Sequence, residues 1–286
     1  MRPDATLLQT SHGIVESAVV GEGPAFLCLH GAMGGWDQAL ILGRAIAPPS
    51  GSRVVALSRP GYLGTPLGSG RSPEDQADLY AAMLDTLGIA EAVVVAVSGG
   101  GRSALQLALR HRDRCRALVL VSTVGEPMTE GLSWSRSLKL WLVQRGWLAT
   151  SLRRRVERDP ASAARRAIRD PETRARTLAD PDSGPMLREI LLSSVDRIAR
   201  RLPGTRADIE AGRAPTPPLE DIRVPTLVVH GTEDPVVPLG RHGAILAQRI
   251  PGAELFAVDG GEHFVILSHR SAIRARVATF LEEHGA

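Results

Sequence analysis

The sequence is poor in cysteine, lysine and aromatic residues, and each shortage argues against a class of protein. Its two cysteines, Cys28 and Cys115, are too few for a disulfide framework, and we expect both to be free thiols in the reducing cytoplasm. Lys139 is the only lysine, so 33 of the 34 basic residues are arginine. We attribute this bias to genome composition, because the sequence has no zinc-ligand cluster and no basic stretch interleaved with its few aromatic residues (3%). Nucleic-acid binding is therefore not expected.

Long apolar segments are also missing. No window of 18 uninterrupted apolar residues occurs, so we expect no transmembrane helix and no stable insertion into a membrane. The first 13 residues lack the apolar core of a secretory signal. Hydrophobic residues nevertheless make up 43% of the 286 residues and charged residues 23%, which is typical of a globular protein and not of a disordered one. We therefore expect a cytoplasmic protein with a substantial core.

Apolar runs of strand length alternate with segments of helical periodicity. The expected strands span residues 15–20, 25–29, 53–57, 92–97, 115–122, 226–230 and 255–258. The expected helices span residues 36–46, 73–87, 100–110, 239–249 and 265–283. This alternation predicts an α/β fold with a mostly parallel, doubly wound sheet.

The alternation is interrupted in the middle of the chain. Between residues 126 and 221 no strand is expected, and short helical stretches are separated by prolines. We therefore predict a core whose first part spans residues 1–124 and whose second part spans residues 222–286. Residues 125–221 are predicted to form a helical cap, or lid, inserted between these two parts.

A serine occurs at a predicted strand–helix junction, in the segment V-S-G-G-G. A sharp turn at this point would expose the hydroxyl of Ser98 at the carboxyl edge of the sheet. Such a turn requires small residues two positions before and two positions after the serine, and these are Ala96 and Gly100. The amide of Gly99, at the helix N-terminus, would lie where an oxyanion develops. Taken alone, the segment fits a phosphate-binding loop or an ordinary strand–helix turn equally well.

This junction resembles the nucleophile elbow of the α/β-hydrolase fold family, whose pattern is G-x-S-x-G, with Ala96 in place of the first glycine. The upstream segment L-C-L-H-G-A-M-G resembles the oxyanion loop of that family. The resemblance implies that the amide of Ala32 is the second oxyanion donor, and we interpret His30 as a structural residue. The segment S-R-P-G-Y-L-G resembles the structural turn that follows the next strand.

Two downstream segments complete the resemblance. The segment H-G-T-E-D-P-V-V-P is similar to the family's acid loop, and G-G-E-H-F is similar to its histidine loop. The resemblance implies a catalytic triad of Ser98, Asp234 and His263, in the chain order expected of this family. Glu126, which follows the preceding predicted strand, is the alternative acid.

This triad implies a defined reaction. His263 would accept the proton of Ser98 as the serine attacks a carbonyl carbon, and would then donate it to the leaving group. Asp234 would orient the imidazole, and the amides of Ala32 and Gly99 would bind the oxyanion. The mechanism needs no metal ion and no organic cofactor.

The substrate pocket is harder to predict, because the resemblance does not extend to the cap. We expect Met33, Tyr62, Trp134 and Trp141 to line it. The two tryptophans lie on one face of a predicted amphipathic helix, which could pack on the core, cover an apolar pocket or lie on a membrane surface.

The predicted cap is rich in arginine. Ten arginines occur between residues 145 and 176, against four acidic residues. They would form a solvated surface or a docking site for an acidic partner, such as a carrier protein or a coenzyme A thioester.

The sequence thus predicts a serine hydrolase that acts on an ester or lactone, or on a thioester, of a small or medium apolar acid. Three alternatives use the same scaffold. They are a hydrolase of C–C bonds, a lyase or cyclase of secondary metabolism that performs no net hydrolysis, and a ligand-binding protein without catalysis.

Overall fold

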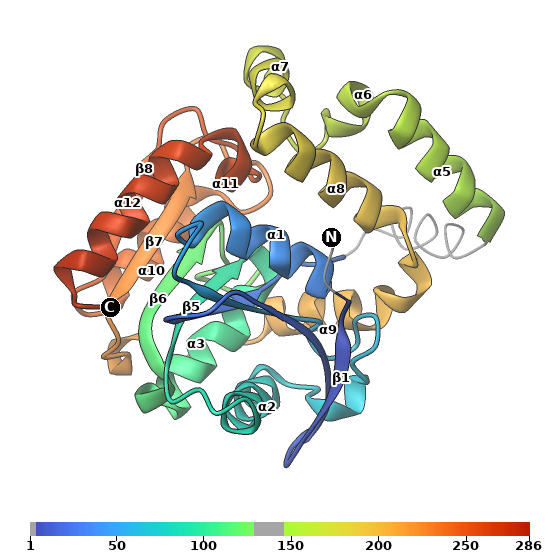
Figure 1. Cartoon of the computed structure of the whole chain (residues 1–286). Coiled ribbons are helices and arrows are strands. Elements are labelled where there is room, and N and C mark those ends of the chain that lie inside the picture. The colour runs from blue at the N-terminus through green and yellow to red at the C-terminus, as the bar shows by residue number, and fades with distance from the viewer. Residues whose placement is uncertain (1–3, 129–145) are drawn as a thin grey trace.

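An eight-stranded sheet forms the centre of the protein in a computed structural model that describes residues 4–128 and 146–286 (Figure 1). The strands are β1 (Thr6–Thr10), β2 (Gly13–Val20), β3 (Ala25–Leu29), β4 (Arg53–Leu57), β5 (Ala92–Val97), β6 (Cys115–Val121), β7 (Thr226–Gly231) and β8 (Glu254–Val258). Their order in the sheet is β1-β2-β4-β3-β5-β6-β7-β8. The pairs β1–β2 and β2–β4 are antiparallel and all other neighbours are parallel, which confirms the prediction of a mostly parallel α/β sheet.

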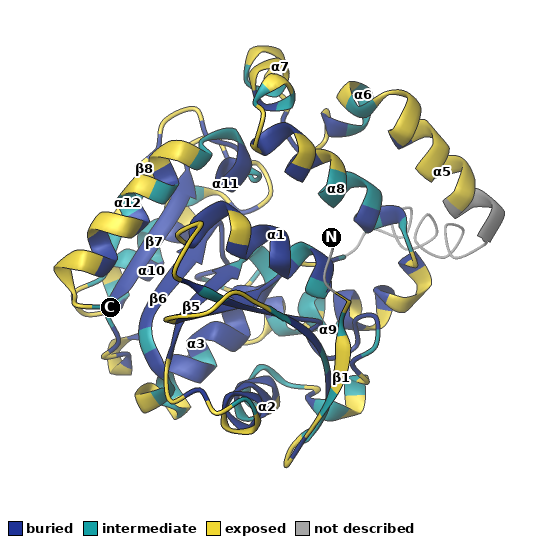
Figure 2. Ribbon diagram, in the orientation of Figure 1, coloured by how far each residue is buried: buried dark blue, intermediate teal, exposed yellow. Residues whose placement is uncertain are grey.

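Helices cover both faces of this sheet. Helices α1 (Trp36–Ile46) and α12 (Arg270–Glu283) pack on one face, and α2 (Pro73–Thr86), α3 (Gly101–Arg110) and α10 (Gly243–Arg249) pack on the other. The central strands are apolar along their whole length because successive residues point to opposite, equally buried faces. In β5, for example, Val93 and Val95 belong to the core on the α1 side, whereas Val94 and Ala96 belong to the core on the α2 side. Figure 2 shows the resulting buried sheet between helices whose outer faces are exposed.

Three elements differ from the prediction. Strand β1 was not expected, because its five residues at the edge of the sheet are mostly exposed and carry no alternating apolar pattern. The last helix is interrupted at His269, whose backbone is not helical, so that a short helix α11 (Val265–Ser268) precedes α12. The helix expected over residues 239–249 is likewise broken at His242, whose backbone is not helical and whose imidazole accepts hydrogen bonds from the amides of Gly125 and Glu126.

Helices α5 to α9 lie between β6 and β7, and we call residues 146–213 the helical insertion. These helices are α5 (Gly146–Arg158), α6 (Pro160–Ala164), α7 (Pro171–Ala179), α8 (Ser183–Val195) and α9 (Leu202–Arg213). The prolines that separate the helical stretches begin helices here, since Pro160 follows the N-cap Asp159 and Pro171 follows the N-cap Asp170. No strand occurs in the described part of this region, and α8 packs along α1 (Figure 1).

The described helices also include no candidate for a membrane span, because none combines the necessary length with sufficient apolar character.

Candidate active site

Ser98 follows directly after β5 in a strained backbone conformation. Its φ of 50° lies in the left-handed region, which a residue with a side chain rarely adopts. The turn continues through a short 3₁₀ segment (Ser98–Gly100) into α3. A Cβ atom on Gly100 would lie 2.7 Å from the carbonyl oxygen of Leu29, so only glycine fits at this position. Ala96 is fully buried, and the sheet accommodates it where the family pattern has glycine.

The structure brings Ser98, His263 and Asp234 together in one chain of hydrogen bonds. The distance from His263 Nε2 to Ser98 Oγ is 3.1 Å, and the distance from His263 Nδ1 to Asp234 Oδ2 is 2.8 Å. A carboxylate oxygen can only accept, so Nδ1 carries the proton and Nε2 of the neutral ring is free to accept from the serine hydroxyl. The predicted residues therefore have the geometry of a nucleophile, a general base and an orienting acid.

Asp234 is held as a carboxylate by several donors. Its side chain is fully buried, and its Oδ1 atom accepts hydrogen bonds from the amides of Val236 and Val237, both at 2.9 Å. Burial by itself raises the pKa of the Asp234 carboxyl group. The hydrogen bond and charge of His263, together with the two amides, lower this pKa by more than burial raises it, so the net shift is downward. Among the described residues, the hydrogen bonds of the His263 ring go to Asp234 and Ser98, and none goes to the alternative acid, Glu126.

The acid loop and the histidine loop are joined through their backbones. The amide of Glu233 donates to the carbonyl oxygen of Gly261 (2.9 Å), and the amide of Gly260 donates to Thr232 Oγ1 (2.9 Å). A Cβ atom on Gly231 would lie 2.1 Å from the oxygen of Gly261, so the two loops could not approach so closely without this glycine. These contacts fix the distance between Asp234 and His263.

The two predicted oxyanion donors lie next to each other beside Ser98. The amide nitrogen of Ala32 is 3.4 Å from the point that a Cβ atom on Gly99 would occupy. In the turns and loops of the described chain, neither amide donates to another backbone group. The next amide, that of Met33, instead donates to Thr205 Oγ1 in α9 at 3.1 Å. The amide of Met33 is thus occupied by a side chain of the helical insertion, in contrast to the two predicted donors.

The buried ring of His30 joins this loop to the loop after β4 through hydrogen bonds. The distance from His30 Nδ1 to the carbonyl oxygen of Gly31 is 2.7 Å, and Nε2 accepts a hydrogen bond from the amide of Arg59 at 3.0 Å. Burial and the nearby Arg59 charge lower the pKa of His30 well below its usual value. A neutral ring that donates through Nδ1 and accepts through Nε2 has the structural role that the sequence suggested.

A cavity of about 240 Å³ opens beside Ser98 and His263. Its walls come from α1, α8, α11 and the loops around the candidate site. The apolar lining from these three helices comprises Ile41, Leu42, Ala45, Ile190, Ile266 and Leu267. Gln38 lies at the same wall of α1, and no aspartate, glutamate, lysine or arginine is among the described residues that line the cavity.

Two of the four predicted pocket residues, Tyr62 and Met33, do not line this cavity. Tyr62 is fully buried, and its hydroxyl donates to Asp208 in α9, so it does not reach the cavity. Met33 is half-buried and does not line the cavity, because its sulfur lies 3.3 Å from Thr205 Oγ1. Trp134 and Trp141 lie outside the described residues.

Arg102, in the helix that follows the serine turn, donates to carbonyl oxygens at the end of α9. The guanidinium nitrogens contact the oxygens of Gly212, Ala214 and Pro215 at 3.0 to 3.5 Å. These carbonyls have no partner within their own helix, and a cation is favourable at a helix C-terminus. Arg102 therefore attaches α9 to the helix that follows the serine turn.

Known proteins that resemble this chain in sequence or structure include hydrolases. Residues 24–270 match a family model described as alpha/beta hydrolase fold. A solved structure of an alpha/beta hydrolase fold protein from Nakamurella multipartita is similar, with a TM-score of 0.86 and 33% identity over 99% of this chain and 100% of that one. The 2-hydroxymuconate semialdehyde hydrolase of Pseudomonas putida is 29% identical over 90% of this chain and 91% of its own length. The pimeloyl-[acyl-carrier protein] methyl ester esterase of Aromatoleum aromaticum is 29% identical over 86% of this chain and 93% of its own length.

Proposed function

Because the chain belongs to the alpha/beta hydrolase fold family, we propose that it is a serine hydrolase of an ester or lactone of a small or medium apolar acid. The observation that carries this proposal is the hydrogen-bonded chain of Ser98, His263 and Asp234 at the mouth of an apolar cavity. The likeness to a methyl ester esterase supports the ester as the bond that is cleaved.

In this mechanism Ser98 Oγ attacks the carbonyl carbon while its proton passes to His263 Nε2. The carbonyl oxygen becomes an oxyanion, which the amides of Ala32 and Gly99 bind, and Asp234 stabilises the imidazolium. When the tetrahedral intermediate collapses, the bond to the leaving alcohol breaks and His263 donates its proton to that alcohol. Water, deprotonated by His263, then cleaves the acyl-enzyme and regenerates Ser98.

The cavity favours an aliphatic acyl group of medium length. Along α1 its lining runs from Gln38 to Ala45, a rise of about 10 Å at 1.5 Å per residue. The alternative reaction is the hydrolysis of a C–C bond, which the likeness to 2-hydroxymuconate semialdehyde hydrolase suggests. We favour it less, because a muconate bears a carboxylate and the described lining of the cavity offers no cation.

We further propose that the helical insertion, within the predicted segment 125–221, acts as the cap of this cavity. Helix α8 contributes Ile190 to the cavity wall. At the histidine loop, Glu262 Oε1 accepts hydrogen bonds from the amides of Arg169 and Asp170, at 2.7 and 2.9 Å. Since Glu262 precedes His263, this contact joins the insertion to the histidine loop.

The test is the hydrolysis of p-nitrophenyl esters from acetate to decanoate by the wild type and the Ser98→Ala variant. We expect turnover that requires Ser98 and an optimum at a medium chain length. Ser122→Ala is a matched control, because Ser122 also follows a strand with a left-handed backbone (φ 48°) but its hydroxyl is fully buried. Equal turnover by the wild type and Ser98→Ala would refute the proposal.

If no ester is hydrolysed, labelling with a fluorophosphonate separates the remaining alternatives. A labelled Ser98 without hydrolysis would favour thioester, C–C bond or non-hydrolytic chemistry. An unlabelled Ser98 would favour the ligand-binding alternative.

A second candidate concerns the group that carries the acyl chain. We propose that an acidic acyl-carrier protein, or coenzyme A, docks on a groove of the helical insertion between α5, α6 and α8. Arg155, Arg165 and Arg166 border this groove, and none of the three forms an ion pair with a described residue. Phe264, which follows His263, lines both the groove and the cavity. The likeness to an esterase of a carrier-bound substrate supports this candidate.

Charge reversal tests the docking candidate. We expect Arg155→Glu combined with Arg165→Glu to raise the KM for an acyl-carrier or acyl-coenzyme A thioester, with no change for p-nitrophenyl esters. Arg71→Glu, an exposed arginine outside the insertion, is the matched control. A KM for the thioester that equals that of the wild type would exclude the docking surface.

Finally, we propose that the protein is located in the cytoplasm, because its two cysteines are free thiols. Both Cys28 and Cys115 are free and buried, and burial raises the pKa of the Cys115 thiol to about 12. Buried neutral thiols of this kind are typical of proteins in a reducing compartment.

A further inference from the structure

Met33, which follows the oxyanion donor Ala32, has a backbone conformation that requires support. Its φ of 62° lies in the left-handed region, although Met33 is not glycine. Such a conformation persists only where the surrounding structure determines it. Within the loop itself, one hydrogen bond from the amide of Gly34 to the oxygen of Gly31 closes the turn at 3.2 Å. The remaining contacts to the Met33 backbone come from side chains outside the loop.

The helical insertion supplies a hydrogen bond on each side of Met33. On the amide side, Thr205 Oγ1 accepts from the Met33 amide at 3.1 Å. The single hydroxyl proton of Thr205 has two acceptors within reach, the carbonyl oxygen of Arg201 at 2.9 Å and the sulfur of Met33 at 3.3 Å. With either acceptor, the lone pairs of the hydroxyl oxygen accept the hydrogen bond from the Met33 amide. On the carbonyl side, the oxygen of Met33 accepts from Arg201 Nη1 and from Gln38 Nε2, both at 3.4 Å.

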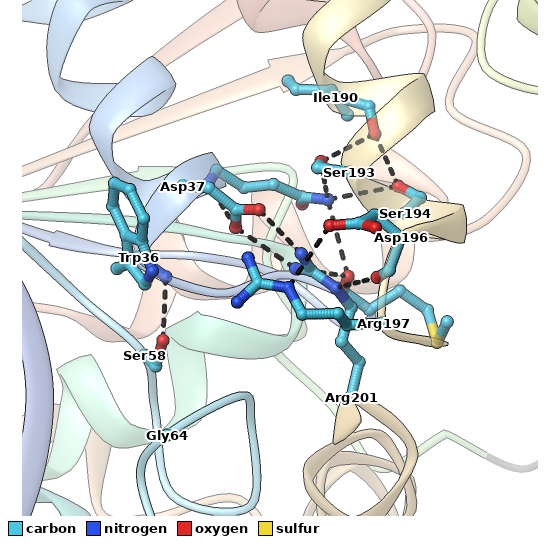
Figure 3. Close-up of polar contacts among 12 residues, drawn as sticks. Trp36, Asp37, Ser58, Gly64, Ile190, Ser193, Ser194, Asp196, Arg197 and Arg201 are labelled. Carbon is cyan, nitrogen blue, oxygen red and sulfur yellow. Dashed lines mark hydrogen bonds and ion pairs between the residues drawn. The ribbon is translucent and has the colours of Figure 1, made fainter. Parts of the chain in front are cut away.

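Arg201 is itself held in place by hydrogen bonds (Figure 3), and Gln38 also contacts α8. Arg201 is fully buried and forms two hydrogen bonds to the carboxylate of Asp37 in α1, at 3.2 and 2.6 Å, and a third to the oxygen of Asp196. The two protons of Gln38 Nε2 are shared among the oxygen of Met33 and, at shorter distances of 2.9 and 3.1 Å, the hydroxyls of Ser193 and Ser194 in α8. The support of Met33 is thus preformed and not dependent on mobile side chains.

Helix α9 approaches the serine turn closely because glycines occupy the contact. The amide of Gly204 donates to the oxygen of Gly61 at 2.9 Å, and a Cβ atom on Gly204 would lie 2.2 Å from the ring of Tyr62. One turn further along the same face of the helix, Asp208 Oδ2 is 2.8 Å from the point that a Cβ atom on Gly99 would occupy. Helix α9 therefore lies directly against both segments that carry the oxyanion donors.

We infer that Thr205 of the helical insertion is a positioning residue for the oxyanion hole. Its hydrogen bond fixes the peptide between Ala32 and Met33. This peptide meets the one that carries the amide of Ala32 at the Cα atom of Ala32, so Thr205 limits the rotation of the donor through the backbone of one residue. The inference rests on the proposed function, because an oxyanion hole has a role only if Ser98 attacks a carbonyl or a similar centre. Thr205 itself does not touch the reacting atoms.

The test compares Thr205→Val with Thr205→Ser. Valine preserves the shape of threonine and removes the acceptor, whereas serine keeps the hydroxyl. Removal of one oxyanion donor in a related site lowers kcat by about 10²- to 10³-fold. A misdirected donor is a smaller loss, so we expect Thr205→Val to lower kcat for a p-nitrophenyl ester by roughly ten- to a hundredfold, with KM within threefold of wild type. Thr205→Ser is expected to restore kcat to within threefold.

The second readout is the rate of phosphonylation of Ser98 by a fluorophosphonate, whose phosphonyl oxygen occupies the oxyanion hole and which does not depend on the identity of the substrate. In Thr205→Val this phosphonylation rate should fall in parallel with kcat. Thr177→Val is the matched control, because Thr177 is a buried threonine in α7 whose hydroxyl donates within its own helix, to the oxygen of Thr173. Thermal unfolding of each variant reports whether the fold is retained.

The outcomes separate this inference from the proposed function. Normal phosphonylation of Thr205→Val, or an equal loss in Thr177→Val, would overturn the inference and leave the proposed function intact. A wild type that is unreactive toward both esters and the fluorophosphonate would overturn the proposed function, and the inference with it.

Discussion

The carboxylate of Asp208 in α9 forms a two-point ion pair with the guanidinium of Arg59, in the contact between the helical insertion and the loop after β4. Asp208 Oδ1 accepts from Arg59 Nη1 at 2.8 Å, and Oδ2 accepts from Arg59 Nη2 and from the hydroxyl of Tyr62. Burial lowers the pKa of Arg59, but the charge of Asp208 outweighs it and the net shift is upward. Arg59 Nε also donates to the oxygen of His30, so the pair connects α9 to the oxyanion loop.

We predict that Asp208→Ala destabilises the protein by about 3–5 kcal/mol. Loss of one partner from a buried ion pair leaves the other charge uncompensated, and Arg59 is only 1% exposed. Equilibrium unfolding in urea at pH 7 measures this change. The control is Glu157→Ala, which removes the exposed partner of Arg153 in α5 and should change the free energy of unfolding by less than about 0.5 kcal/mol. Similar values for the two variants would contradict the prediction.

The candidate catalytic residues could be predicted because each is fixed by its own segment of chain. Ser98, Asp234 and His263 all follow strands of a parallel sheet, and the carboxyl ends of such strands meet at one edge. Short local patterns therefore suffice to bring together residues that are 165 and 29 positions apart.

The contacts of the helical insertion could not be predicted in the same way. Tyr62 is a polar residue in a loop, and without knowledge of Asp208, 146 residues away, the lining of a pocket was the natural interpretation. Helical periodicity shows that α9 is a helix and does not show which strand end it contacts. Thr205 was missed for the same reason, since its only signal is a threonine in a helix.

Strand β1 escaped prediction for a different reason. It is an edge strand, and Leu7 is 64% exposed, so hydrophobic burial does not determine its pattern. Its place is determined by pairing with β2, from Thr6 opposite Ser17 to Thr10 opposite Gly13. Pairing between backbones leaves little trace in the order of side chains.

We predict that Asp234→Asn lowers kcat by about 10³- to 10⁴-fold with little change in the fold. An asparagine in place of the acid of a Ser–His–Asp triad stabilises the wrong tautomer of the histidine, and losses of this size follow. Steady-state hydrolysis of the best p-nitrophenyl ester measures kcat. Glu233→Gln and Glu126→Gln test the neighbouring acid and the alternative acid, and both should retain kcat within about threefold. A large loss in Glu126→Gln with a small one in Asp234→Asn would reverse the assignment.

We predict a defined contribution of Asp78 to the pH dependence of stability. Hydrogen bonds from Arg110 and His111 lower the pKa of this carboxyl group from 3.8 to about 2. A carboxyl group whose pKa is lower in the folded state stabilises it fully above the unfolded pKa, and this contribution is lost as the pH falls through the folded pKa. The stabilisation should therefore be present above about pH 4 and disappear toward pH 2. Because Arg110 is half-exposed and the ion pair is screened by solvent, this stabilisation amounts to about 1 kcal/mol.

Comparison of the wild type with Asp78→Asn checks this window. The difference in free energy of unfolding should be constant from pH 5 to 7 and shrink between pH 4 and 2. A difference that persists at pH 2 would show that the asparagine acts through packing and not through the charge.

The length of the cavity leads to the last prediction, that Ala45→Leu shifts the preferred acyl chain of the substrate toward shorter acids. Ala45 lines the cavity two helical turns beyond Gln38, which contacts the oxyanion loop, so its methyl group faces the part of the cavity farther from that loop. Leucine would occupy the space of two or more methylene groups of the acyl chain. Each methylene group that loses its apolar site costs about 0.8 kcal/mol, so kcat/KM for the decanoate ester should fall at least about tenfold.

The acetate ester, which does not reach Ala45, should be hydrolysed at the wild-type rate. Ala278→Leu, the same substitution at an exposed position of α12, should alter neither ester. If Ala45→Leu lowered the acetate and decanoate rates equally, the substitution would have disturbed the candidate catalytic residues, and the acyl group would have to bind elsewhere.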